Sequence, residues 1–414
     1  MRTLKIHIKR SHPDYHEALR QMQISKNLYN QANFLARQTY FHYCGKKYTL
    51  TDNKTLDDWI LNDNYNGNMI GFEQLRKVLT QYIKINSKVA QSILRNLANN
   101  WQSFFSVKRA NIPKYKKEQY NLVPYTIQAI SRRSLCNGII KPAGFKNGVQ
   151  LPRWFDPNST QACRLICKNG QIWLLVIYKE IPKIQIKQGN TIAAIDFGVD
   201  ALIAMAYSNN SSPIIVKDKR IKTWNQLWNK TVALNKSNNK HRWSKFLNSI
   251  TAKRNLRIEQ IINRASNVVV SELVKHNVSK LILGKNDGWK QNVNMGKRNN
   301  QTFVQIPFVK LIDNITYKAK SIGIDVVMQE ESYTSKASFI SLDQIPVFDA
   351  EYSNKKYTFS GKRKYRGMYE DGNTRIHADI NAAFNIMRKN QENEAIKVWG
   401  GKTNIQPLGI KLYS

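Results

Sequence analysis

The chain of 414 residues is long enough for two or more domains. Lys and Arg total 65 and Asp and Glu total 28, which gives a formal net charge of +37, while 42% of the residues are apolar. This apolar content excludes a disordered polybasic tail, and the longest apolar runs of seven residues exclude a membrane span of about 20. The first ten residues contain no apolar signal segment, and the four cysteines form no disulfide framework. We therefore expect a soluble, cytoplasmic protein that binds a polyanion and no membrane.

Residues 1–190 are predicted to form a β-rich unit with a helical insertion. Residues 3–9 alternate between polar and apolar side chains, which predicts a strand. Apolar residues recur at helical spacing over 19–35 and 78–105. This spacing predicts two amphipathic helices, separated by the Asn-, Asp- and Gly-rich loop 62–71.

A hairpin is predicted next, in a region where prolines separate short strands. The apolar segments 162–167 and 172–178 are joined by the sequence KNG, which is a good hairpin turn. Cys163 and Cys167 fall on one face of the first of these strands. Two thiols without nearby histidines are expected to be structural.

A second domain is predicted to begin at Thr191. Three short apolar strands form an antiparallel meander, and alternating strands and helices follow, which is the order expected of an RNase H-like α/β domain. Residues 398–414 are predicted to be a short tail. The expected strands are 191–198, 201–208, 213–217, 280–284 and 324–329, and the expected helical segments are about 221–276, 306–321 and 379–389.

Three long stretches of the chain contain no acidic residue, namely 74–117, 119–155 and 219–258. The last of them interleaves basic side chains with tryptophans. Because phosphates bind cations and unpaired bases stack on aromatic rings, this mixture is typical of a nucleic-acid channel. The alternative is a solvated basic face whose tryptophans belong to the core. The residues expected to bind nucleic acid are Arg76, Lys77, Lys84, Lys116, Lys117, Trp224, Trp228, Arg242, Lys362, Arg363 and Arg366.

Acidic residues stand at the ends of predicted strands and at the start of a predicted helix. Asp196 ends one apolar strand, on the same face as Ala194, while Glu330 and Glu331 follow another, and Asp379 opens the last helix. Magnesium is commonly held by one or two carboxylates, and two ions about 3.5–4 Å apart can stabilise both oxygens of a phosphodiester cleavage. Each acid also has a structural alternative: a turn at Asp196, a surface strand end at the glutamates, and a helix cap at Asp379.

Four segments resemble the transposon-encoded TnpB (OrfB) proteins, in the same order and over nearly the whole chain. AAIDFGVDALIAMA resembles their first RuvC motif, EESYTSKASF their Tyr-Thr-Ser-Lys segment, and ADINAAFNIMRK their last RuvC motif. KVAQSILRNLANNWQSFFSVKRANIPKYKK is similar to the helical segment and lysine-rich stretch that precede their nuclease domain. The resemblance implies an RNA-guided, magnesium-dependent DNA endonuclease of a transposable element, related to the compact type V CRISPR effectors.

The middle catalytic glutamate of this family has a different place in this chain. Many members carry it at the end of the strand that here reads LILGKNDGW, where Gly284 stands instead and Asp287 is a weaker candidate. In a subset of the family, and in the eukaryotic Fanzor relatives, this glutamate looks as if it has moved to a Glu-x-x-Thr-Ser position. Glu331 fits that pattern through its spacing to Thr334, whereas strand alternation alone does not choose between Glu330 and Glu331.

The zinc site of the family is also expected to be absent. The family's insert often carries two Cys-x-x-Cys pairs, but this chain has Ala337 and Ser338 there and no cysteine after Cys167. A tetrahedral Cys₄ zinc site therefore has no ligands in this region. The basic, aromatic segment SGKRKYRGMY stands in the insert instead.

The resemblance implies a nuclease site in which Asp196, Glu331 and Asp379 bind two Mg²⁺ ions, with Asp196 bridging them. The expected partners are a guide RNA and target double-stranded DNA, in a prokaryotic cytoplasm near the nucleoid, and the oligomeric state stays open. The alternatives are a nuclease-silent RNA-guided repressor and an RNA-independent RNase H-like transposase or resolvase. The implied domains are a wedge-like β-barrel (1–12 and 119–190), a helical recognition insertion (13–118), a RuvC nuclease domain (191–332 and 375–395), the basic insert (333–374) and a tail (396–414).

Overall fold

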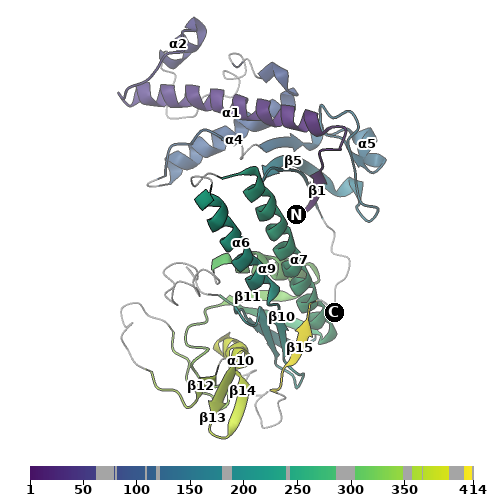
Figure 1. Cartoon of the computed structure of the whole chain (residues 1–414), viewed down its shortest axis with the longest axis vertical. Helices are drawn as coiled ribbons and strands as arrows, with labels where there is room; N and C mark the ends of the chain where they lie inside the picture. The colour runs from purple at the N-terminus through teal and green to yellow at the C-terminus, as the bar shows by residue number, and fades with distance from the viewer. Residues whose placement is uncertain are drawn as a thin grey trace. The chain divides into compact units, whose positions relative to one another are not determined.

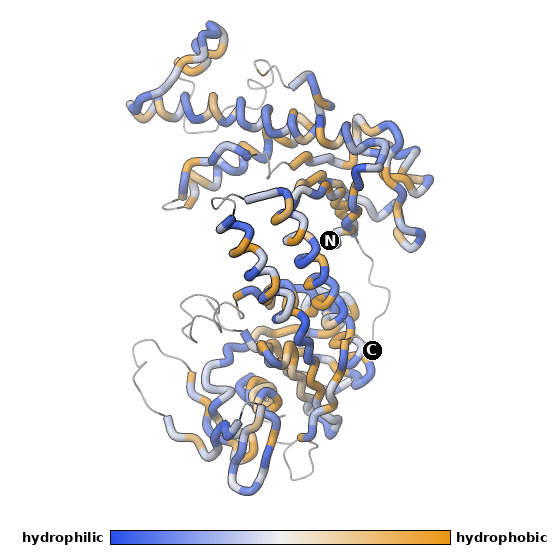
Figure 2. The backbone as a smooth tube through the Cα atoms, viewed as in Figure 1, coloured by the Kyte–Doolittle hydropathy of each residue, from blue (hydrophilic) through white to orange (hydrophobic). Residues whose placement is uncertain are grey.

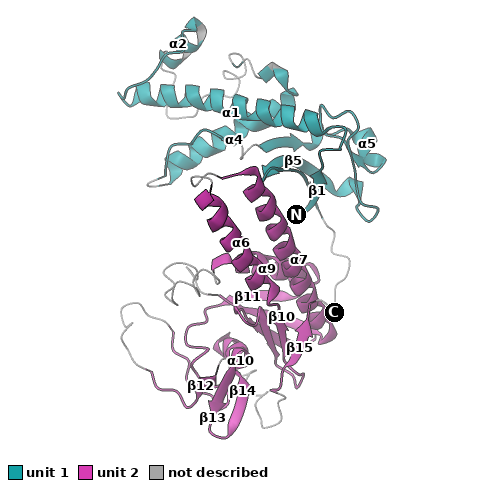
Figure 3. Ribbon diagram, in the orientation of Figure 1, with its two compact units in different colours: residues 1–181 teal, residues 182–414 magenta. Residues whose placement is uncertain are grey.

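The chain forms two compact units, which we call unit 1 (residues 1–181) and unit 2 (residues 182–414) (Figure 3). Each unit has its own hydrophobic core. None of the described helices is long and apolar enough to cross a membrane. The structure is a computed structural model, and it describes residues 1–61, 79, 82–107, 110–117, 122–179, 189–238, 243–285, 304–347, 357–365, 367–390 and 405–412.

Unit 1 is built on a four-stranded antiparallel sheet with the order β1-β6-β5-β2 (Figure 1). The predicted N-terminal strand is confirmed as β1, which pairs with β6. The predicted hairpin is also confirmed: β5 and β6 are joined by Asn169 and Gly170, both with positive φ, as a tight hairpin turn requires. Closure of this sheet into a barrel stays a prediction. The strands are β1 (Arg2–Ile8), β2 (Leu122–Thr126), β5 (Thr160–Lys168) and β6 (Gln171–Tyr178), and a separate pair consists of β3 (Ile139–Ile140) and β4 (Val149–Gln150).

Two long helices cover the apolar face of this sheet. The predicted helix over 19–35 is confirmed, but the second helix begins at Ser87 rather than near residue 78. Asn86 caps it by accepting a hydrogen bond from the Lys88 amide, and a short 3₁₀ turn precedes the cap. The apolar spacing continues through that turn because Tyr82 and Ile85 are also buried, so the pattern alone did not reveal the boundary. The helices of unit 1 are α1 (Tyr15–Tyr43), α2 (Lys54–Leu61), α4 (Ser87–Ser106) and α5 (Arg132–Cys136), and the predicted loop 62–71 lies outside the described residues.

A buried carboxylate ties the start of α1 to a distant loop. Asp14 is 2% exposed and accepts hydrogen bonds from the backbone amides of Lys146, Asn147 and Gly148 at 2.8–3.0 Å. Burial raises the pKa of Asp14, but the three backbone amides together outweigh it and hold this pKa below its usual value. The charge of Asp14 therefore stabilises the folded state above about pH 4, and this contribution is lost as the pH falls through the lowered pKa.

We predict that Asp14→Asn lowers the free energy of unfolding by about 1–3 kcal/mol at pH 7, with a smaller difference at pH 3, where the native carboxylate also takes up a proton. Hydrogen exchange of the backbone amides at residues 146–148 in the full chain measures this local loss. Asp156→Asn is the matched control, because Asp156 also accepts a backbone amide but at an exposed position. An equal loss at both pH values would show that the charge of Asp14 is not the cause.

Unit 2 is built on a six-stranded mixed sheet with the order β11-β10-β7-β8-β9-β15. The predicted antiparallel meander is confirmed as β7, β8 and β9, and β10 and β11 add parallel strands beside β7. The single helical segment predicted over 221–276 is two helices, the second capped by Ser244. The strands are β7 (Thr191–Asp196), β8 (Ile203–Tyr207), β9 (Ile214–Lys217), β10 (Val278–Gly284), β11 (Asp325–Gln329) and β15 (Leu408–Lys411), and the helices are α6 (Arg220–Asn238), α7 (Lys245–Lys275), α9 (Phe308–Ser321) and α10 (Ala378–Asn390).

The two faces of this sheet carry different helices (Figure 1). Ile195 and Met205 belong to the core that α7 and α9 cover, while Ala194 and Ala204 belong to the core that α10 covers. The strands β7 and β8 are buried along nearly their whole length, as expected of a sheet covered on both sides, and Figure 2 shows the hydropathy of the chain. Because alanines line the α10 face, that helix lies close to the ends of β7 and β10.

The predicted C-terminal tail is wrong in part, because residues 408–411 form β15, an edge strand parallel to β9. Ile410 packs against the core of unit 2 and Leu412 is buried. The segment is only four residues long, and its partner β9 lies almost two hundred positions earlier in the chain. Its short alternation therefore gave too little signal for a strand prediction.

The insert between β11 and α10 contains a three-stranded antiparallel sheet. Its Tyr369 is fully buried and donates a hydrogen bond to the Lys336 carbonyl, so this aromatic residue belongs to the core. The outer strand exposes Lys362, Arg363, Lys364 and Tyr365. The strands are β12 (Lys362–Tyr365), β13 (Met368–Asp371) and β14 (Thr374–His377).

Candidate active site

Asp196 stands at the C-terminal end of the central strand β7. As alternation along the strand predicts, it points to the face that α10 covers, together with Ala194. Burial raises the pKa of Asp196 well above its usual range, and the charges of Glu331 and Asp379 raise it further, while Arg363 opposes them. The structure therefore brings together three acids that lie far apart in the sequence.

Glu331 follows β11, which lies two strands away from β7 in the sheet. Burial raises the pKa of Glu331 to about 7, and the charge of Glu330 adds to this effect. Glu330 itself points elsewhere, since it forms an ion pair with Lys389 on α10 and accepts a hydrogen bond from the Ser332 amide. Of the two glutamates that the sequence left open, Glu331 is the one whose charge acts on Asp196.

The end of β10 explains how Glu331 gains its position. A Cβ atom on Gly284 would lie 2.8 Å from Oε2 of Glu331, 2.6 Å from the Ile386 side chain and 3.3 Å from the Ile195 carbonyl oxygen. The carboxylate of Glu331 therefore fills the space that a side chain at residue 284 would need. This is the position at which the resemblance led us to look for a glutamate.

Asp379 is the second residue of α10, so it lies inside the helix rather than at its cap. Its Oδ1 accepts a hydrogen bond of 3.1 Å from Nη2 of Arg363 on β12, and its backbone amide donates to Nδ1 of His377. The insert thus supplies the cation that faces the three acids. Asp287, the weaker candidate from the sequence, lies outside the described residues.

The donor set suits a divalent cation in its chemistry. The charges of Glu331 and Asp379 disfavour the charged form of the buried Asp196, and a cation that prefers oxygen ligands would relieve that repulsion. As the side chains stand, no three Asp, Glu, His or Cys residues within the described ranges surround a single point closely enough to hold an ion. Arg363 instead binds Asp379, so a cation at this site would replace it as the partner of that carboxylate.

The lysine-rich segment before β2 lies along α1 in unit 1. Asn30 holds it at Lys116, where its Oδ1 accepts from the backbone amide and its Nδ2 donates to the carbonyl oxygen. Asn33 and Arg37 both donate to the carbonyl oxygen of Pro113. The backbone of this segment is therefore fixed while its lysine side chains stay exposed. Among the predicted nucleic-acid residues of unit 1, Lys84, Lys116 and Lys117 are exposed, and Arg76 and Lys77 lie outside the described residues.

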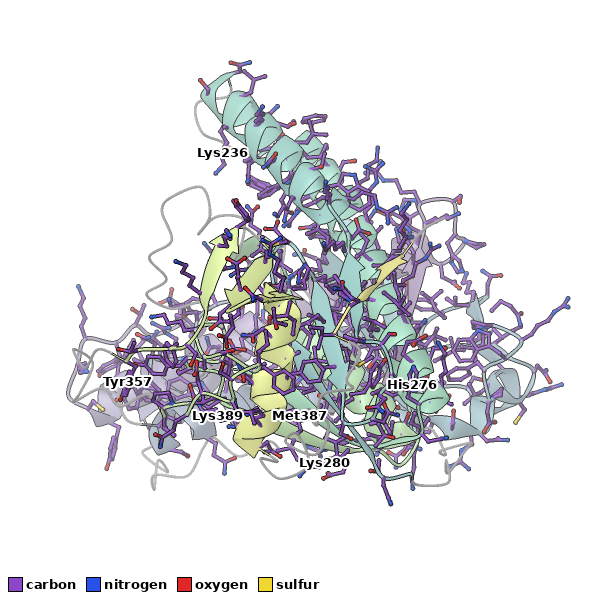
Figure 4. The ribbon with its side chains drawn as sticks, turned by 90° about the horizontal axis from the view of Figure 1, so that it is seen from below. Lys236, His276, Lys280, Tyr357, Met387 and Lys389 are labelled. Carbon is purple, nitrogen blue, oxygen red and sulfur yellow. The ribbon has the colours of Figure 1, made fainter. Side chains whose placement is uncertain are left out.

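The two predicted tryptophans of α6 face arginines of α7, and their binding of nucleic acid stays a prediction. The ring of Trp224 faces the guanidinium of Arg257 and the ring of Trp228 faces that of Arg254, at 5.3 and 4.9 Å from the ring centres. Each indole thus stacks with an arginine of α7 and holds the helix pair together. Lys236 lies near the other end of this pair (Figure 4), and Arg242 and Arg366 lie outside the described residues.

Sequence reasoning missed a basic cavity in unit 1. The cavity has a volume of about 260 Å³ and lies between α1, α4 and strands β2 and β5. Its described lining contains cations and carboxamides but no acidic residue. The three asparagines stand at the i, i+3 and i+4 positions of α4, so their spacing was a readable signal. The polar lining residues are Ser25, Lys26, Asn96, Asn99, Asn100, Lys116 and Arg164, with Tyr29 beside them.

Residues 308–386 match a family model described as Cas12f1-like, TNB domain. A cryo-EM structure of a Cas12f1–sgRNA–target DNA complex is 16% identical with a TM-score of 0.36, covering 94% of this chain and 99% of that chain. A cryo-EM structure of a CRISPR-Cas12f ternary complex is 15% identical with a TM-score of 0.36, covering 90% of this chain and 81% of that chain. No curated protein matches the chain.

We predict that Gly284→Ala displaces the Glu331 carboxylate and weakens any function of this site by at least about tenfold, because the added methyl group would overlap it. The measurement is the activity proposed below, with circular dichroism to show that the fold is kept. Gly409→Ala is the matched control, since Gly409 also lies in a strand but has nothing within 4 Å of its added Cβ. Equal activity in both variants would contradict the placement of Glu331.

Proposed function

We propose that the chain is an RNA-guided DNA endonuclease that cuts phosphodiester bonds at Asp196, Glu331 and Asp379. The observation that carries this proposal is the convergence of three acids from distant parts of the chain: burial raises the pKa of Asp196 well above its usual range, and the charges of Glu331 and Asp379 raise it further. Arg363, which pairs with Asp379, lowers the pKa of Asp196, but burial and the two other acids outweigh it.

The fold supports this proposal. Three antiparallel strands are followed by two parallel strands on the far side of the first, in the order expected of an RNase H-like domain. The acids stand at the C-terminal end of the central strand, just after the outermost parallel strand, and at the start of the helix that covers one face. The Cas12f1-like match over 308–386 contains two of them, Glu331 and Asp379.

The three acids have the chemistry to hold the metal. Asp196, Glu331 and Asp379 would together hold the Mg²⁺ ions, since both other acids act on Asp196. Bound Mg²⁺ would supply Lewis acidity and a lowered pKa of bound water. Arg363 would leave Asp379 and remain beside the site, where a guanidinium can bind a phosphate oxygen of the DNA strand.

The guide RNA and the target duplex would be held by the basic surfaces. The exposed lysines of the segment held by Asn30 and the basic strand β12 contribute charge, and base pairing with the guide would choose the sequence. A short motif beside the target would be read in the cavity of unit 1, where asparagine carboxamides can bind base edges and Arg164 a phosphate.

The setting that we propose is a prokaryotic transposable element. A repressor that has lost its nuclease activity is a weaker alternative, because the three acids are all present and converge. An RNA-independent transposase or resolvase would use the same three acids. It would need no guide, so treatment of the purified protein with ribonuclease before the assay separates it from the proposed enzyme.

We predict that Asp196→Asn and Glu331→Gln each lower the rate of DNA cleavage by about a thousandfold or more, because each removes a negative ligand without changing shape. The assay uses the protein with its copurified RNA, a matching duplex and Mg²⁺. Binding of that duplex, measured by gel shift, is expected to stay within about twofold.

Glu330→Gln is the matched control, because Glu330 is adjacent but pairs with Lys389. This variant is expected to keep most of its cleavage activity. If it is inactive and Glu331→Gln is active, Glu330 is the middle ligand. Full cleavage by Asp196→Asn would refute the nuclease site itself.

We predict separate effects for two residues of the cavity. Arg164→Ala is expected to weaken duplex binding for all sequences and to reduce the slope of log K against log salt by about one, as the loss of one phosphate contact does. Asn96→Ala is expected to relax the preference at one base pair beside the target, at a cost of about 1–3 kcal/mol. A library of flanking sequences measures both. Lys168→Ala, on the same strand but outside the cavity lining, is the control for Arg164.

A further inference from the structure

The proposed nuclease chemistry gives no role to two sequence motifs, the Glu-x-x-Thr pattern after β11 and the asparagines of α10. Asn381 and Asn385 lie within the last motif of the sequence and are fully buried, which is unusual for carboxamides unless they are hydrogen-bonded. Both side chains bind the backbone of the segment that follows Glu331, as described next. They therefore connect two of the three acids.

A β-turn fixes the backbone of Glu331. The carbonyl oxygen of Glu331 accepts hydrogen bonds from the Thr334 amide at 3.2 Å and from the Thr334 hydroxyl at 2.8 Å. Tyr333 has a backbone φ of 64°, a value that residues other than glycine and asparagine rarely adopt. Such a conformation persists only where neighbouring contacts enforce it. Thr334 is 3% exposed, so its two hydrogen bonds to the Glu331 carbonyl are shielded from water.

Asn385 continues this connection to α10. Its Nδ2 donates to the carbonyl oxygen of Thr334 at 2.9 Å and to that of Ala337 at 2.7 Å. Both N–H groups of the Asn385 side chain are therefore used by the turn segment. Its Oδ1 accepts a hydrogen bond from Arg388. Asp379 stands six residues earlier on the same rigid helix.

A second group of contacts holds the remainder of the segment. Asn381 donates to the Ala337 carbonyl and accepts from the Phe339 amide, at 2.8 and 2.9 Å. Arg388 donates to the carbonyl oxygens of Leu342 and Asp343. These bonds stabilise the segment but touch residues farther from Glu331. From α10, Asn385 thus reaches the glutamate backbone through Thr334, while Lys389 contacts the next residue by donating to the Ser332 carbonyl at 3.0 Å.

We propose that Thr334 and Asn385 are positioning residues that set the place of Glu331 relative to Asp379 and so determine how tightly the acidic site binds a divalent cation. The inference rests on the proposed nuclease site. It explains why a glutamate that is not on the end of β10 needs a threonine three positions later: Glu331 reaches the site from a turn, and the turn must be held.

The test measures cation binding rather than cleavage. Titration calorimetry with Mn²⁺ is carried out on the full chain, comparing wild type with Thr334→Val, which keeps the shape of the side chain but loses the hydroxyl donor. We expect the Mn²⁺ dissociation constant to rise about tenfold, a change typical of losing a group that orients a metal ligand. Thr334→Ser restores the donor and is expected to bind like wild type.

Thr39→Val is the control for the loss of a buried hydroxyl. The Thr39 hydroxyl also donates to a backbone carbonyl, at 3.0 Å, but in unit 1. This variant is expected to bind Mn²⁺ like wild type. Asn385→Asp keeps the shape of the asparagine but removes both N–H donors, and it is expected to weaken binding in the same direction as Thr334→Val. It provides the test if the valine variant does not fold.

Two outcomes would overturn the inference in different ways. If Thr334→Val and Asn385→Asp fold and bind Mn²⁺ like wild type, the two residues do not position the site, although the nuclease proposal stands. If Asp196→Asn also binds Mn²⁺ like wild type, the three acids are not the cation site and both proposals fail.

Discussion

The dominant constraint in unit 2 is the burial of Asp196 beside two further carboxylates, those of Glu331 and Asp379. Charged acids in such surroundings either take up protons or acquire a cation, and the raised pKa of Asp196 expresses that conflict. Other features of the unit accommodate it. Alanines let α10 lie close to the strand ends, and Gly284 leaves room for the carboxylate of Glu331. The insert contributes Arg363, which donates to Asp379.

Much of this could be predicted from the sequence because it depends on periodicity. The strands around Asp196 are short and apolar, and alternation placed that acid on its correct face. Features that depend on contacts between distant segments could not be predicted in this way. The edge strand at 408–411 gains its stability from β9, and the start of α4 is set by the cap at Asn86 within a longer apolar pattern. Neither appears in the local spacing.

The same distinction applies to the candidate site. Sequence spacing proposed Asp196 and Asp379, but it left Glu330 and Glu331 open, because the two are neighbours at the end of one strand. What separates them is the partner of each side chain: Lys389 for Glu330, and the space beside Gly284 for Glu331. The buried asparagines of α10 were visible in the motif, yet their role depends on backbone carbonyls that no sequence pattern reveals.

Charge balance links the acidic site to the rest of the chain. A net charge of +37 would oppose folding in isolation, so the basic surfaces favour a polyanionic partner, while the acidic site favours a cation. A DNA strand together with divalent cations satisfies both requirements at once, since its phosphates neutralise the lysines and also supply oxygen ligands to the ions beside the acids. The fixed backbone of the lysine-rich segment at Asn30 fits this view, because ordering that segment before binding reduces the entropy lost on binding. At the acidic site Arg363 provides part of this balance by pairing with Asp379, and a nucleic acid with its metal ions could neutralise both kinds of charge.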